Sequence, residues 1–204
     1  MPLWSDARFG LDNFSLFPFD FLPGGALAVE HGDEIVQTIN ELQSSYDLVV
    51  ATQDWHPKGH KSFYTSHPGK TPFELISLNG LDQVLWPEHC VQGTKGAELV
   101  PELLTNAVEG IFRKGMDKEI DSYSGFFDNG RKKSTGMADY LKGRGVTEIA
   151  VCGVAADYCV YYTANDALDL GFKASIIERA SKAIDVERYE RVKSDFQKKG
   201  GFVI

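Results

Sequence analysis

Two kinds of hydrophobic pattern alternate along the chain. Short continuous apolar runs, rich in β-branched residues, predict buried strands, and they fall at residues 48–51, 111–112, 149–151, 174–177 and 202–204. Apolar residues at helical spacing predict helices, from residue 33 onward, over 134–141, from 159 to about 170 and from about 186 to 199. Strands that are apolar throughout and alternate with helices indicate a mostly parallel sheet with helices on both faces. We therefore predict a single α/β domain over residues 1–204.

Two segments do not follow this alternation. The apolar run 14–19 predicts a strand, but Pro18 has no backbone N–H and restricts that strand to an edge or an end. A long irregular region extends from Pro57 to about residue 110 and contains several prolines and glycines. Loops of this length inside a compact domain are usually functional, so we expect the region to contribute to a site.

Composition narrows the class of protein. The formal net charge of −8 argues against nucleic acid or an anionic membrane surface as a partner. No apolar run is long enough to span a bilayer, and the chain does not open with a signal-peptide pattern. Its three cysteines are an odd number without disulfide-scaffold spacing, which favours a reducing compartment. We expect a cytoplasmic protein.

Cys159 lies where a predicted strand ends and a predicted helix begins. Unpaired amides and the positive dipole end of a helix start favour a thiolate, the form of cysteine that attacks carbonyl carbons. A cysteine that merely fills space in the core is the alternative. The position of Cys159 alone does not decide between them.

Other reactive side chains follow other predicted strands. Asp54 and His56 are two residues apart on extended chain, so their side chains can point the same way and bind zinc, iron or manganese. A third ligand is available from the irregular region, which contains His60, His67 and His89. Lys114 follows another strand and can lower the pKa of a nearby thiol. The alternatives are an ordinary surface turn for Asp-x-His and a solvated lysine at a strand end.

In combination, several motifs resemble those of nicotinamidases, which belong to the isochorismatase-like cysteine hydrolase superfamily. The matching segments are PGGALAV (23–29), TQDWHP (52–57), WPEHCVQGT (86–94), RKG (113–115), DSYSGFFDN (121–129) and CGVAADYCV (152–160). They occur in the family's order from about Phe21 to the end of the chain. The resemblance implies an isochorismatase-like fold and an enzyme of pyridine nucleotide salvage that takes the small molecule nicotinamide. It leaves open assembly into a homo-oligomer.

Carried over residue by residue, the resemblance implies roles for individual side chains. Cys159 would be the nucleophile and Lys114 its cationic partner. One divalent metal, with zinc the first choice and iron or manganese the others, would be held by Asp54, His56 and His89. The ring pocket and oxyanion hole follow from the same comparison: Phe21, Trp86 and Tyr123 would line the ring, and the amides of Ala155 and Cys159 would form the oxyanion hole, with a cis peptide between Val154 and Ala155.

One position departs from the family pattern. The family has a general-base aspartate before the position of Phe21, and the aligned residue here is Leu16. Asp12 and Asp20 are the nearby carboxylates, and neither has the expected context. Ala156 is a smaller departure, because the family usually has threonine there. Loss of the base would damage proton transfer to and from the reacting groups.

Three functions remain open from the sequence. The first is a metal-assisted amidohydrolase that converts nicotinamide to nicotinate and ammonia through a thioester. The second is a related hydrolase of another small amide, because pocket residues rather than the fold set the substrate. The third is a catalytically impaired paralogue that binds a pyridine ligand or a partner protein, which Leu16 favours and the intact metal, lysine and cysteine positions oppose.

Overall fold

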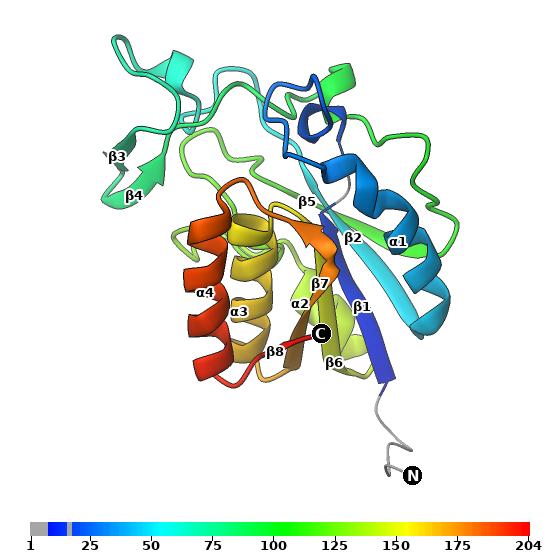
Figure 1. The fold of residues 1–204 in the computed structure, drawn as a ribbon. Coiled ribbons are helices and arrows are strands. Elements are labelled where there is room, and N and C mark those ends of the chain that lie inside the picture. Colours follow the sequence, from blue (N-terminus) through cyan, green and yellow to red (C-terminus); the bar gives the residue numbers. More distant parts are fainter. Residues whose placement is uncertain (1–7, 16–17) are drawn as a thin grey trace.

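The computed structural model describes the backbone of residues 8–15 and all of residues 18–204. A six-stranded sheet forms its centre, in the order β5-β2-β1-β6-β7-β8 (Figure 1). Its strands are β1 (Arg8–Ser15), β2 (Leu48–Asp54), β5 (Val108–Lys114), β6 (Val146–Val154), β7 (Lys173–Lys182) and β8 (Phe202–Val203). Every neighbouring pair runs parallel. The predicted parallel α/β architecture is confirmed.

Helices cover both faces of this sheet (Figure 1). They are α1 (Ile35–Leu42), α2 (Met137–Gly143), α3 (Tyr161–Asp169) and α4 (Val186–Lys198). Alternate residues of β2 point to opposite faces: Val49 packs in the cluster that contains α1, whereas Val50 packs in the cluster that contains residues of α2, α3 and α4. Both faces of the strands are therefore buried, which explains their continuous apolar runs.

Short helical turns connect these elements. Five are 3₁₀-helices and one is a π-helix: Phe19–Phe21, Gly32–Glu34, Gln43–Ser45, Tyr64–Ser66, Lys95–Ala97 and the π-helical Ala156–Val160. In the part of the chain that the structure describes, no helix is both long enough and apolar enough to cross a membrane.

The first strand differs from the sequence prediction. β1 extends from Arg8 to Ser15, whereas the predicted strand covered 14–19. β1 lies inside the sheet and pairs on both sides, with β2 and β6. A proline cannot donate a ladder hydrogen bond in such a strand, and Pro18 instead forms an isolated bridge to Leu99. The polar pair Asp12–Asn13 interrupts the apolar run that would have marked β1 in the sequence.

The irregular region contains a hairpin that the sequence reasoning missed. Strands β3 (Leu75–Leu78) and β4 (Leu81–Val84) pair antiparallel, at a distance from the main sheet in Figure 1. Asn79 and Gly80 join them with φ values of 53° and 83°. Asn-Gly is a strong signal for a two-residue hairpin turn, because both positions need positive φ.

The position of β1 between β2 and β6 indicates where a ligand site lies. The chain passes from β1 to β2 on one side, and β6 lies on the other side of β1. Ligands of open α/β sheets bind beyond the carboxyl ends of strands at such a switch point. Asp54, Lys114 and Val154 are the last residues of β2, β5 and β6, so these strands deliver their following loops to one place.

Candidate active site

Cys159 is held in a π-helical turn after β6. The chain leaves β6 through a cis peptide between Val154 and Ala155, as the resemblance implied, and enters the π-helix Ala156–Val160 before α3 begins. Cys159 therefore lies at the predicted strand-to-helix junction. It is in a π-helical turn that leads directly into α3, and not in the first turn of an α-helix. Its side chain is buried, with an exposed fraction of 7%.

Lys114 contacts three groups with its buried ammonium. Nζ donates to Sγ of Cys159 over 3.3 Å, to the carbonyl oxygen of Ser122 over 3.0 Å and to the carboxylate of Asp54. An ammonium has three hydrogens, so this set uses its full donor capacity. Lys114 therefore lies between a carboxylate and the candidate nucleophile.

The charges around Lys114 set its protonation state and that of its neighbours. Burial alone would lower the pKa of the Lys114 ammonium, but the Asp54 carboxylate and the Cys159 thiol hold it above its ordinary value. Burial raises the pKa of the Cys159 thiol to about 11, although Lys114 and a hydrogen bond from the Ala155 backbone act in the opposite direction. In this metal-free site burial therefore favours the protonated thiol, whereas Lys114 favours the thiolate.

Three buried side chains form a candidate metal site beside Lys114. The donor atoms of Asp54, His56 and His89 all lie within 4.8 Å of one another. Nδ1 of His56 donates to the carbonyl of Gly115 over 3.0 Å, and Nδ1 of His89 donates to the carbonyl of Pro87 over 2.8 Å. These bonds leave Nε2 of each ring as the free acceptor, the usual support for a ligating histidine.

The donor set fits a divalent metal. Burial and the neighbouring His89 lower the pKa of His56 to about 3, so His56 is neutral and can ligate. Burial would raise the pKa of Asp54, but the Lys114 ammonium holds it below its ordinary value, so Asp54 is a carboxylate. Two imidazole nitrogens and one carboxylate suit zinc, iron and manganese.

The other two histidines of the irregular region are engaged elsewhere. Nε2 of His60 donates to the carbonyl of Asp117 over 2.7 Å, and its Nδ1 accepts from the backbone of Ser62 over 3.1 Å. His67 bonds through Nε2 to the carbonyl of Lys61 over 2.8 Å. His60 also lies within 4.8 Å of His56 and Asp121, but it has no free nitrogen.

An aromatic cavity opens over Cys159, with about 330 Å³ free of protein atoms. It brings together the residues that the resemblance singled out for the pocket, namely Phe21, Trp86, Tyr123 and Ala155. The sequence reasoning missed the wall residue Tyr158, whose ring meets Trp86 edge-to-face at 4.8 Å. Its place directly before Cys159 was the available signal.

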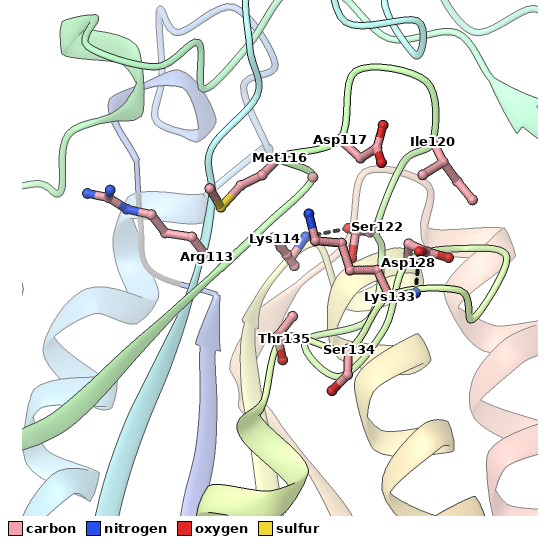
Figure 2. A pocket seen from close by; sticks show the side chains of 11 residues that line it. Arg113, Lys114, Met116, Asp117, Ile120, Ser122, Asp128, Lys133, Ser134 and Thr135 are labelled. Atoms are coloured by element: carbon pink, nitrogen blue, oxygen red, sulfur yellow. Dashed lines mark hydrogen bonds between the residues drawn. The ribbon is translucent and has the colours of Figure 1, made fainter.

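A second cavity lies on the other side of Lys114 (Figure 2). Lys114 and Ser122 line both cavities. Figure 2 shows Lys133 extending toward Lys114 from a loop that Asp128 fixes through its bond to the Lys133 backbone, 2.7 Å long. Lys114 and Ser122 thus form a wall between the aromatic cavity and this second cavity.

The candidate base residues have different outcomes. Leu16 lies outside the described residues, and so does the side chain of Asp12. Asp20 accepts from the backbone N–H of Cys90 over 2.7 Å and also bonds to the N–H of Ala26 over 3.4 Å. It fixes loops and is not within the cavity lining. Among the side chains of residues 18–204, Asp54 is the carboxylate bonded to Lys114.

Comparisons with known proteins agree with this site. The isochorismatase domain matches residues 17–204. A nicotinamidase of Acinetobacter baylyi is 49% identical over 81% of this chain and 78% of its own length. A nicotinamidase of Escherichia coli is 44% identical over 82% of this chain and 80% of its own length.

Solved structures of related proteins are also similar to this chain. An Acinetobacter baumanii nicotinamidase and pyrazinamidase superposes with a TM-score of 0.94 at 44% identity, covering 98% of this chain and 97% of its own. A Pyrococcus horikoshii pyrazinamidase in complex with zinc has a TM-score of 0.78 at 36% identity, over 97% and 98% of the two chains. The L. infantum protein PnC1, solved with nicotinate, has a TM-score of 0.83 at 34% identity, over 97% and 92%. With this fold, this site and these relatives, the chain belongs to the isochorismatase family.

Proposed function

We propose that this protein is a nicotinamidase, a cysteine amidohydrolase that converts nicotinamide and water to nicotinate and ammonia. One observation carries the proposal: Lys114 bonds at once to Sγ of Cys159 and to the carboxylate of Asp54, at the wall of an aromatic cavity. A nucleophile, a fixed cation and a metal-ligand set are the parts that a metal-assisted amidase requires. The nicotinamidases of A. baylyi and E. coli support the choice of substrate.

The first half of the reaction forms a thioester. The sulfur of Cys159 attacks the carboxamide carbon and transfers its proton toward the amide nitrogen. Backbone amides of Ala155 and Cys159 would stabilise the developing oxyanion, and the Lys114 ammonium adds positive charge nearby. The C–N bond then breaks, ammonia leaves, and a nicotinoyl group remains on Cys159.

The second half consumes water. A water molecule attacks the thioester carbon, the C–S bond breaks, one proton of the water passes to the Cys159 sulfur, and the other is released to solution. The product is nicotinate. Because burial keeps the pKa of the Cys159 thiol near 11, the site favours return of the enzyme to the protonated thiol.

Asp54, His56 and His89 would hold one divalent metal, and zinc is the first choice, with iron or manganese as the others. Bound there, the metal would supply an electrophilic centre that holds the pyridine nitrogen and turns the carboxamide toward Cys159. The zinc complex of the P. horikoshii pyrazinamidase supports this assignment. The aromatic rings of Phe21, Trp86 and Tyr123 would enclose the substrate ring.

The curated relatives do not favour a catalytically impaired paralogue. No observation favours a related hydrolase of another small amide. We also propose that residues 1–204 form one domain, and the match of the isochorismatase domain to residues 17–204 supports this. A cytoplasmic location and a homo-oligomer stay predictions.

An ammonia-release assay with nicotinamide tests the proposed function. The purified protein, with its metal content measured, should release one ammonia for each nicotinate formed. Cys159→Ala should abolish release, whereas Cys152→Ala, which changes a buried cysteine outside the cavity lining, should retain it. Absence of ammonia release from the metal-loaded protein, or full release by Cys159→Ala, would contradict the proposal.

A further inference from the structure

Gln83 is a buried glutamine just outside the lining of the aromatic cavity. It lies on β4 of the hairpin with an exposed fraction of 2%, whereas its neighbour Asp82 is exposed. Burying an amide costs free energy unless it is hydrogen-bonded. The partners of this amide therefore explain why a glutamine lies on the inner side of the hairpin.

Those partners line the aromatic cavity. Nε2 of Gln83 donates to Oδ2 of Asp121 over 3.1 Å and to the hydroxyl oxygen of Tyr123 over 3.1 Å. Its shortest hydrogen bond, over 2.7 Å, goes to the carbonyl oxygen of Val84, so two N–H hydrogens are shared among three acceptors. Asp121 and Tyr123 both line the cavity above Cys159. One amide nitrogen thus holds two groups of the cavity wall.

Trp86 also packs against Tyr123. The rings of Trp86 and Tyr123 meet edge-to-face at 6.2 Å. Gln83 and Trp86 together therefore fix both the position and the tilt of the Tyr123 ring.

The Asp121 carboxylate is fixed in the same way. Oδ1 accepts from the backbone N–H of Ser122 over 2.8 Å, and Oδ2 accepts from Gln83. One oxygen of Asp121 lies within 4.8 Å of a ring nitrogen of His56 and of a ring nitrogen of His60. A buried carboxylate that lost one of its two donors could turn relative to His56.

We propose that Gln83 is a positioning residue for the amidohydrolase reaction. Through Tyr123 and Asp121 it sets the orientation of the substrate ring, and therefore the angle at which the carboxamide meets Cys159. This inference rests on the proposed function. The alternative is that Gln83 only attaches the hairpin to the rest of the protein. Asn79 in the hairpin turn does this through its 2.8 Å bond to the carbonyl of Glu119.

The test compares Gln83→Met with Gln43→Met in metal-loaded protein. Gln43 is also buried and donates to a backbone carbonyl, that of Leu104, over 2.7 Å, and it is not in the cavity lining. Loss of a residue that supports a site costs about 10- to 100-fold, so kcat of Gln83→Met should fall by that factor. KM should change much less, because a tilted ring still binds but presents its carbonyl poorly.

A double-mutant cycle separates positioning from simple loss of stability. In the Tyr123→Phe background, Gln83→Met should lose less kcat than in the wild type, because one of the two cavity groups that Gln83 holds is already gone. Gln83→Asn, which keeps the amide but shortens its reach, serves if Gln83→Met does not fold, and its kcat should also fall. Equal losses in both backgrounds, or wild-type kinetics with only a lower melting temperature, would overturn the proposal.

Failure of the proposed function would look different. In that case the wild type and Gln43→Met would also release no ammonia from nicotinamide. The orientation of bound nicotinate, seen in crystal structures of the two variants, would then be the readout. A turned Tyr123 ring and nicotinate ring in Gln83→Met but not in Gln43→Met would support a positioning role, and unchanged rings in both would overturn it.

Discussion

Lys114 and Asp54 occupy paired positions on the neighbouring strands β5 and β2, and their side chains form a buried ion pair. The strand register alone brings them together, since each is the last residue of its strand. Lys114 also contacts Cys159, so this pair connects the candidate metal site with the candidate nucleophile. Replacing either charge should therefore affect both stability and catalysis.

Lys114→Met should lower kcat by about 10²–10³-fold, the usual cost of removing one group that stabilises developing negative charge. It should also destabilise the metal-free protein by about 3 kcal/mol, because the Asp54 carboxylate would stay buried without its partner. Urea unfolding in the presence of a chelator measures the second effect. Lys70→Met removes the more exposed ion pair with Glu74 and should cost less than about 1 kcal/mol. Equal costs for the two variants would contradict the buried-pair account.

His89→Ala should reduce zinc affinity by more than about 100-fold, which exceeds the loss expected for a residue that only supports a ligand. His67→Ala is the control, because His67 bonds to the Lys61 carbonyl and does not belong to the candidate ligand set. Metal titration followed by elemental analysis measures both. Unchanged metal content in His89→Ala would remove His89 from that set.

Alkylation of the metal-free protein should label Cys159 before Cys90 or Cys152. Burial raises the pKa of all three thiols, to about 11 for Cys159 and about 12 for Cys152, and Cys90 lies well above its ordinary value. Cys159 alone also lines the cavity. Because the thiolate fraction grows as pH rises toward the pKa, labelling of Cys159 should accelerate by about tenfold per pH unit between pH 7 and 9.

Iodoacetamide labelling followed by peptide mapping gives both the order and the pH dependence. A rate for Cys159 that levels off below pH 8 would show a thiolate already formed in the free site. First labelling at Cys152 would contradict the burial of that side chain.

Asp20→Asn should leave ammonia release largely intact, because an asparagine oxygen can still accept from the Cys90 amide. Asp12→Asn decides the question of the base. If Asp12 supplies the missing carboxylate, this change should lower kcat by about 10²–10⁴-fold, the usual contribution of a positioned acid–base group. Ordinary turnover in both variants would mean that neither aspartate is the base.

Much of the fold could be predicted from the sequence because parallel strands are apolar throughout. The strands around 48–51 and 149–151 were found, and the structure extends them to Leu48–Asp54 and Val146–Val154. β1 was misplaced because Asp12 and Asn13 break its apolar run. The hairpin was missed although Asn79-Gly80 carried its turn signal.

The site could be predicted only in part. The position of Asp54, His56 and Lys114 after strands pointed to one edge of the sheet, whereas selecting His89 over His60 required the hydrogen bonds of each ring. The sequence position of Cys159 indicates a nearby helix end but not the depth of burial, which raises the pKa of its thiol. Gln83 carried no signal, since its partners lie about forty residues away on another loop.

Cys159 should carry the nicotinoyl group during turnover. Rapid acid quenching of the metal-loaded enzyme with excess nicotinamide, followed by intact-mass and peptide analysis, would detect that intermediate. We expect a nicotinoyl adduct on the peptide that contains Cys159, absent from Cys159→Ala and removed by hydroxylamine, which cleaves thioesters. An enzyme that releases ammonia at its full rate from Cys159→Ala, or that carries the adduct on another residue, would contradict this expectation.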